Sequence, residues 1–245
     1  MERKYREVRY EMNGFLDAEV FPVYKKAKSR GKRYGATPEC MKIVNERNSR
    51  RRLSRLLHAN FGERDLALHL TYDENNLPAS EEDAKRDIMN FLRRARRLYK
   101  NSELEFKYVS VTEKGVRSKR VHHHLVVSGG VDRDMLERLW KMGRANSRRL
   151  QFDDNGIVGL SVYMTKQSLY FRRYNCSRNL LDPDKKKRQN DSRVSRRAIS
   201  SVCDFYDEVT IARLYPGYKL FDVEFNVSDL TGEYYAYLRL RKIRE

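Results

Sequence analysis

The stretch Arg120-Val121-His122-His123-His124-Leu125-Val126-Val127-Ser128 holds three of the five histidines in a chain of 245 residues. Its apolar, β-branched residues, followed by two glycines, predict a strand. Because side chains alternate between the faces of a strand, His122 and His124 are expected on one face and His123 on the other. Two imidazoles one strand repeat apart are well placed to bind a single metal ion. The alternative is a solvated histidine patch on an exposed strand.

Glu113 is the best candidate for a third ligand. It ends the apolar run Lys107–Thr112, which also predicts a strand, and the segment Lys114–Arg120 is rich in Gly, Ser and charge, as expected of a hairpin turn. In such a hairpin, Glu113 lies opposite or near the histidine pair. Two neutral imidazoles and one carboxylate suit Mn²⁺ or Zn²⁺, and Mg²⁺ where water and a phosphate complete the shell.

A helix is predicted around Ile157, Leu160 and Met164, which recur at helical spacing. Tyr163 and Lys166 are three residues apart and share a face of this helix. A phenol has a pKa of about 10, so it needs a cation or metal nearby to attack at neutral pH, and Lys166 could supply that cation. The alternative, favoured for the pair in isolation, is a half-buried tyrosine beside a solvated lysine.

The pattern His-x-His followed by Tyr-x-x-Lys resembles the HUH endonucleases, the nickases of rolling-circle replication. The resemblance departs at its centre, where His123 stands in place of a bulky apolar residue. Four longer segments resemble the replication initiators of bacterial plasmids, phages and integrative elements: Leu66–Tyr72, Val111–Gly115, Leu139–Arg144 and Asn175–Leu180. The resemblance covers roughly residues 60–185.

This resemblance implies a palm like an RNA-recognition motif, with the histidines on the sheet, the tyrosine helix over them and an acidic third ligand, in agreement with Glu113. It implies that Tyr163, helped by Lys166 and by Mn²⁺ or Mg²⁺, attacks single-stranded or hairpin origin DNA. The tyrosine then keeps the 5′ phosphate and releases a 3′ hydroxyl. The alternatives are a relaxase or single-tyrosine transposase with the same chemistry, or a non-catalytic nucleic-acid-binding protein.

Charge supports a polyanionic partner. The chain has 52 Lys and Arg against 34 Asp and Glu, a formal net charge of +18, and neutralising phosphates releases their counterions. A helix is predicted from Thr37 to about Asn60, and its crowded arginines repel one another unless an anion lies among them. The segment Pro183–Arg197 is expected to be a mobile linker or loop. Candidate DNA contacts, with a solvated basic face as the alternative, are Arg47, Arg51, Arg55, Lys185, Lys186 and Lys187.

Several classes of protein are disfavoured. No apolar run approaches the roughly 20 residues of a membrane span, and no signal segment opens the chain. Cys40, Cys176 and Cys203 are odd in number and far apart, which predicts a reducing compartment, here the bacterial cytoplasm, and no disulfide framework. No Gly-Lys-Ser/Thr phosphate loop is present, so a host helicase and polymerase are expected partners.

The remaining pattern predicts an α+β fold, an antiparallel sheet with flanking helices on one side. Leu66, Leu68, Leu70 and Tyr72 alternate and predict the first core strand, with His69 on its other face. His69 could approach the metal, but a hydrogen-bonded core histidine is the favoured interpretation. Ser80 begins a helix through a capping box, and a helix after Asp132 is expected to end at Gly143 and to bury Trp140. Further strands are predicted at Leu150–Phe152, Tyr218–Phe225 and Tyr234–Leu240, the last two as a hairpin.

Three segments are expected along the chain. Residues 1–60 are a basic N-terminal region that packs on the core, residues 61–182 form the endonuclease core, and residues 183–245 are a basic linker and C-terminal accessory segment. Within the last segment, Ala198–Val209 predicts a helix.

Overall fold

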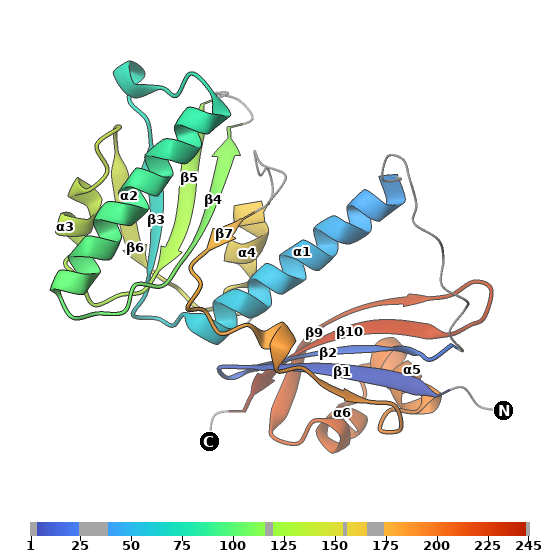
Figure 1. Cartoon of the computed structure of the whole chain (residues 1–245). Coiled ribbons are helices and arrows are strands. Elements are labelled where there is room, and N and C mark those ends of the chain that lie inside the picture. Colours follow the sequence, from blue (N-terminus) through green and yellow to red (C-terminus); the bar gives the residue numbers. More distant parts are fainter. Residues whose placement is uncertain (1–3, 25–38, 116–119, 154–155, 166–173, 244–245) are drawn as a thin grey trace. The chain divides into compact units, whose positions relative to one another are not determined.

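The computed structural model describes residues 4–24, 39–115, 120–153, 156–165 and 174–243. The chain divides into two compact units, Met1–Asn48 with Asp182–Glu245, and Ser49–Leu181. Each unit contains a five-stranded antiparallel sheet with flanking helices, so the α+β prediction is confirmed (Figure 1). The predicted segment 1–60 contributes to both units, because α1 (Glu39–Asn60) spans the boundary between them.

The histidine stretch forms the central strand of the sheet in residues 49–181. Its neighbours are one strand from earlier in the chain and one from the predicted hairpin, and both pair with it in antiparallel register. From edge to edge, the sheet consists of β6 (Ala145–Arg149), β3 (Leu66–Thr71), β5 (Val121–Val127), β4 (Tyr108–Lys114) and β7 (Asn175–Cys176).

One face of this sheet is covered by α2 (Glu81–Asn101) and α3 (Arg133–Arg138) (Figure 1). The Ser80 hydroxyl caps α2 by accepting the backbone N–H of Asp83 at 3.1 Å, as predicted. A 3₁₀ turn, η1 (Glu74–Asn76), precedes this helix. Trp140 is 4% exposed and packs in the same core, so the prediction that it is a core residue is confirmed.

The other face is also covered, so the prediction of helices on one side only is wrong. Apolar residues of α1, Leu53 and Leu57, pack there with Val126 of β5 and with Met164 of α4 (Val158–Thr165). Alternate positions on β4 and β5 are apolar on both faces of the sheet, and burial of both faces stabilises the unit.

Two local predictions in this unit are corrected. The strand lies at Ala145–Arg149 instead of Leu150–Phe152, because these five residues pair with β3 and Leu150 turns into the core at 4% exposure. Helix α3 ends at Arg138 instead of Gly143, where the backbone N–H of Leu139 bonds to the carbonyl of Leu136.

The other unit draws its sheet from both ends of the chain. The predicted C-terminal hairpin is present, and the strand order is β8 (Arg188–Asn190), β1 (Tyr5–Met12), β2 (Phe15–Pro22), β10 (Tyr234–Lys242) and β9 (Tyr218–Val227). Helices α5 (Arg196–Phe205) and α6 (Glu208–Leu214) pack on one face. The single helix expected at 198–209 is broken, because Tyr206 adopts a left-handed conformation with φ 52° and Asp207 caps α6.

The segment Pro183–Arg197 is ordered, which contradicts the predicted mobile linker. It begins with a 3₁₀ turn, η2 (Pro183–Lys185), and continues as β8 along the edge of β1. A bidentate ion pair between Arg6 and Asp191, at 2.6 and 2.7 Å, fixes the end of this strand. Among the described helices, none is both long and apolar enough to cross a membrane.

Candidate metal centre

The pairing of β5 with its two neighbours gathers polar side chains on one face. Glu113 of β4 lies directly opposite His122. On the other side of β5, His69 of β3 lies directly opposite His124. The face therefore carries a compact group, the histidine cluster, made up of His69, Glu113, His122 and His124.

Glu113 is close to both predicted histidine ligands. Its Oε2 atom lies 3.5 Å from Nε2 of His122 and 3.7 Å from Nε2 of His124. Two ligands that each bind one ion at about 2.1 Å stand about 3 Å apart, so a small inward shift would bring all three onto one ion. The second oxygen of Glu113, Oε1, is buried and has no hydrogen-bond partner among the described residues, which fits a carboxylate shaped for a cation.

His122 is oriented by its own strand. Its Nδ1 atom lies 3.4 Å from the carbonyl oxygen of Arg120, which only accepts hydrogen bonds, so Nδ1 carries the proton. Nε2 is then left as a lone-pair donor facing Glu113. Such a backbone contact on the far nitrogen is the usual way in which a ligating imidazole is held in place.

His69 belongs to the cluster, and its interpretation as a core histidine is wrong. Its side chain is exposed, its ring stacks on His124 at a centroid distance of 4.6 Å, and it meets His122 edge-on at 5.3 Å. One ligand atom from each of the three histidines lies within 4.8 Å of the others. The sequence signal that could have found it is the alternation of Leu66, Leu68 and Leu70, which excludes His69 from the core face.

The imidazoles of the cluster are disposed to be neutral. Burial lowers the pKa of His124 to about 3, and the neighbouring histidines act in the same direction. Burial, and then the charge of His122, also lowers the pKa of His69. Neutral imidazole is the form that binds metal ions, so at pH 7 these two rings are ready to act as ligands.

His123 lies on the opposite face and is fully buried. Its Nε2 atom is 2.9 Å from the Tyr72 hydroxyl, and its Nδ1 atom is 2.9 Å from the Thr112 hydroxyl. One ring nitrogen donates and the other accepts, so both are satisfied. These two hydroxyls explain how a histidine replaces the apolar residue of the HUH pattern without leaving a buried polar atom unpaired.

Helix α4 lies beside the cluster. A cavity of about 260 Å³ is lined by His69 and His124, by Leu160 and Met164 of α4, and by residues of β6. The backbone of Tyr163 belongs to α4, between these two lining residues. The side chain of Tyr163 and the whole of Lys166 lie outside the described residues, so their positions relative to the cluster stay predictions.

The predicted DNA contacts differ in exposure. Arg47 is exposed and Arg51 is half-buried, but Arg55 is only 6% exposed because its turn of α1 also carries buried leucines. The guanidinium of Arg55 is thus not presented to solvent, contrary to expectation. The three lysines at 185–187 are exposed and belong to the unit without the histidine cluster.

Comparison with known proteins gives one match. Residues 65–168 match the model of a family of replication-associated proteins, described by its members ORF2 and the gene 2 protein. This segment covers less than half of the chain, and it contains the whole histidine cluster and Tyr163. Neither the curated proteins nor the solved structures include a significant match. The segment that carries the cluster is therefore similar to a replication-associated protein.

Proposed function

We propose that this chain is a replication initiator that nicks and rejoins single-stranded origin DNA and so starts rolling-circle replication. The observation that carries the proposal is the histidine cluster on the sheet beside α4, within a segment similar to replication-associated proteins. The net charge of +18 supports a nucleic-acid substrate.

The residues of the cluster fit a divalent cation. His122, His124 and Glu113 would hold the ion and His69 would complete the set, with neutral imidazoles and one buried, unpartnered carboxylate oxygen as donors. Three imidazoles favour Mn²⁺ over Mg²⁺, which prefers oxygen ligands. When bound, such an ion polarises a phosphate oxygen and stabilises the added charge of the transition state.

Tyr163 is the proposed nucleophile. Its phenolic oxygen forms a bond to the scissile phosphorus as the bond from phosphorus to the 3′ oxygen breaks. The phenol loses its proton and the leaving 3′ oxygen gains one, while the Lys166 ammonium favours the phenolate. The product is a 5′-phosphotyrosine with a free 3′ hydroxyl for a host polymerase. The phosphotyrosine conserves the bond, so the reverse transfer rejoins strands without an energy cofactor.

The test is a denaturing gel. The protein is incubated with Mn²⁺ or Mg²⁺ and with single-stranded origin DNA labelled at its 3′ end, and the label is expected to migrate with the protein. Tyr163→Phe and added chelator should each abolish this adduct. Tyr170→Phe is the matched control and should retain it. An adduct that persists in Tyr163→Phe would refute this nucleophile, and tight DNA binding without any adduct would favour the non-catalytic binding protein.

A further inference from the structure

Edge strand β6 extends the face of the histidine cluster. Asn146 lies directly opposite His69, and Arg148 directly opposite Ala67 on the same face. Both side chains are exposed, and both line the cavity beside His69 and His124. The polar end of this cavity is therefore formed by an amide and a guanidinium next to the candidate metal ligands.

Arg148 lies in an unusual electrostatic setting. Within the described part of the chain, it has no hydrogen bond and no ion pair with a carboxylate. Its charge is close enough to lower the pKa of both His69 and His124. A cation placed beside imidazoles, and beside the metal they would hold, lies in a field that attracts an anion. Because guanidinium matches phosphate in a bidentate manner, a phosphodiester is the anion that fits.

The other end of the cavity is apolar. Leu160 and Met164 of α4 line it, with Ala67 from the sheet. A volume of about 260 Å³ falls below the roughly 300–1,000 Å³ of drug-sized ligand sites, so the space suits a single nucleotide. An apolar wall beside a cation is the combination that accepts the flat face of a base and its phosphate.

We propose that this cavity, the β6 subsite of Asn146, Arg148, Leu160 and Met164, binds the nucleotide next to the scissile phosphate. Arg148 binds the phosphate of that nucleotide, the base lies against Leu160 and Met164, and the Asn146 amide reaches the edge of the base. The inference rests on the proposed function, since it takes the substrate to be single-stranded DNA. Sequence reasoning placed DNA contacts on α1 and at residues 185–187, and it did not include Arg148.

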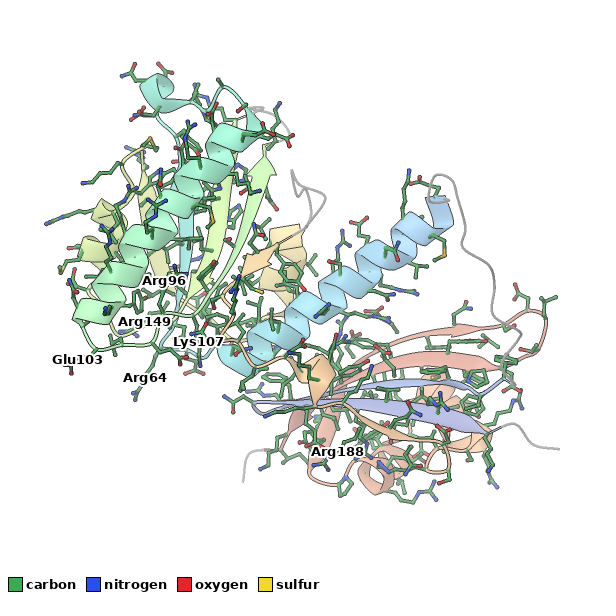
Figure 2. The ribbon with its side chains drawn as sticks, in the orientation of Figure 1. Arg64, Arg96, Glu103, Lys107, Arg149 and Arg188 are labelled. Carbon is green, nitrogen blue, oxygen red and sulfur yellow. The ribbon has the colours of Figure 1, made fainter. Side chains whose placement is uncertain are left out.

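Arg149 provides a matched control. It is the next residue on the same strand, carries the same charge and is also exposed. It pairs with Leu66, on the face that packs against α2, and its Nη1 atom donates to the carbonyl of Arg64 at 3.3 Å (Figure 2). Loss of Arg149 therefore changes the net charge as much as loss of Arg148 does, but on the face without the histidine cluster.

The test measures the affinity of a fluorescent oligodeoxythymidine by anisotropy, in chelator, over a range of salt concentrations. Arg148→Ala is expected to lower affinity about tenfold, as for the loss of one charge-assisted contact. It should also reduce the slope of log K against log [salt] by about 0.7, the value for one phosphate on a single strand. Arg148→Lys should restore the slope but not the full affinity. Arg149→Ala should change affinity by less than about twofold.

This design separates the subsite from the nicking reaction, because binding in chelator needs neither metal nor tyrosine. Equal losses in Arg148→Ala and Arg149→Ala would show a general charge effect and overturn the subsite, even if wild type forms the phosphotyrosine adduct. A loss confined to Arg148→Ala would support the subsite even if wild type forms no adduct.

A second measurement locates the contact once the nicked oligonucleotide is known. Methylphosphonates, which are uncharged, replace its phosphates one at a time. Neutralising the phosphate next to the nick should weaken binding by wild type and by Arg149→Ala, but not by Arg148→Ala. If Arg148→Ala remains sensitive at that position, Arg148 does not bind that phosphate.

Discussion

The Nε2 atom of His58 accepts a hydrogen bond from the backbone N–H of Ile157 at 3.2 Å, which joins α1 to the start of the helix that carries Tyr163. The other ring nitrogen, Nδ1, lies 2.9 Å from the carbonyl oxygen of Ser54, so it must carry the proton. His58 is 4% exposed, and the carbonyl of Ile157 accepts the N–H of Ser161 in the first helical turn. This histidine thus satisfies one of the otherwise unpaired N–H groups at the start of α4.

Replacing His58 tests this link through stability. His58→Leu removes the acceptor and leaves the buried N–H of Ile157 unpaired, so the free energy of unfolding should fall by about 1–3 kcal/mol. His58→Gln can still accept through its side-chain oxygen and should lose less. Urea denaturation at pH 7 measures both values. Equal stability of the Leu variant and wild type would mean that the hydrogen bond contributes nothing.

Stability should fall as the pH is lowered because of His123. Burial lowers the pKa of this histidine from 6.5 to about 3, so below pH 6.5 the unfolded chain binds a proton that the folded chain does not. Protonation then favours unfolding, and stability is lost as the pH falls from about 6.5 toward 3. The slope from one such group is about 1.4 kcal/mol per pH unit. Denaturation at pH 7 and pH 5 measures the change.

The control is His123→Leu, which carries the apolar residue type of the HUH pattern. It should be less stable at pH 7 by about 1–3 kcal/mol, because the hydroxyls of Tyr72 and Thr112 lose their partner. Its loss of stability between pH 7 and pH 5 should be smaller than in wild type. His124, whose pKa is also lowered by burial, accounts for the part that remains. An unchanged pH dependence would contradict the assignment to His123.

His69 should matter more for manganese than for magnesium. His69→Ala removes one of three imidazoles, so Mn²⁺ affinity measured by isothermal titration should fall tenfold or more, whereas Mg²⁺ binding, which relies on oxygen, should change less. Glu113→Gln should weaken both ions. His123→Gln, on the opposite face, should leave both affinities unchanged. If Mn²⁺ binds His69→Ala as tightly as wild type, His69 is not a ligand.

Two glycines should respond to alanine in opposite directions. Gly143 has φ 149°, and a Cβ there would collide with the carbonyl oxygen of Thr71 and the backbone N of Asp73. Gly143→Ala should therefore destabilise the protein by more than about 1 kcal/mol. Gly159 lies in α4 with open space around it, and Gly159→Ala should stabilise by about 0.5–1 kcal/mol. Thermal melts of both variants decide the point, and a stabilised Gly143→Ala would contradict it.

Sequence reasoning placed local relationships correctly and missed distant ones. The alternation of His122, His123 and His124 and the closeness of Glu113 follow from a strand and a short hairpin, whose register is set locally. The place of His69 depends on β3 pairing with a strand about fifty residues later, and no local pattern encodes that register. Leu150 illustrates the same limit, because an apolar residue after a strand resembles one inside it until the core is known. The nucleophile assignment to Tyr163 stays a prediction.

The order of strands along the chain has a consequence for synthesis. Residues 49–181 are inserted between β2 and β8 of the other unit. A ribosome therefore releases all the residues of the histidine cluster long before β10, which pairs with β2 and closes the other sheet. Domains generally fold as units during synthesis, so the inserted unit can fold while β1 and β2 wait for their partner. A nascent chain stalled before β9 would keep the candidate metal centre but expose the edge of β2, a template for aggregation.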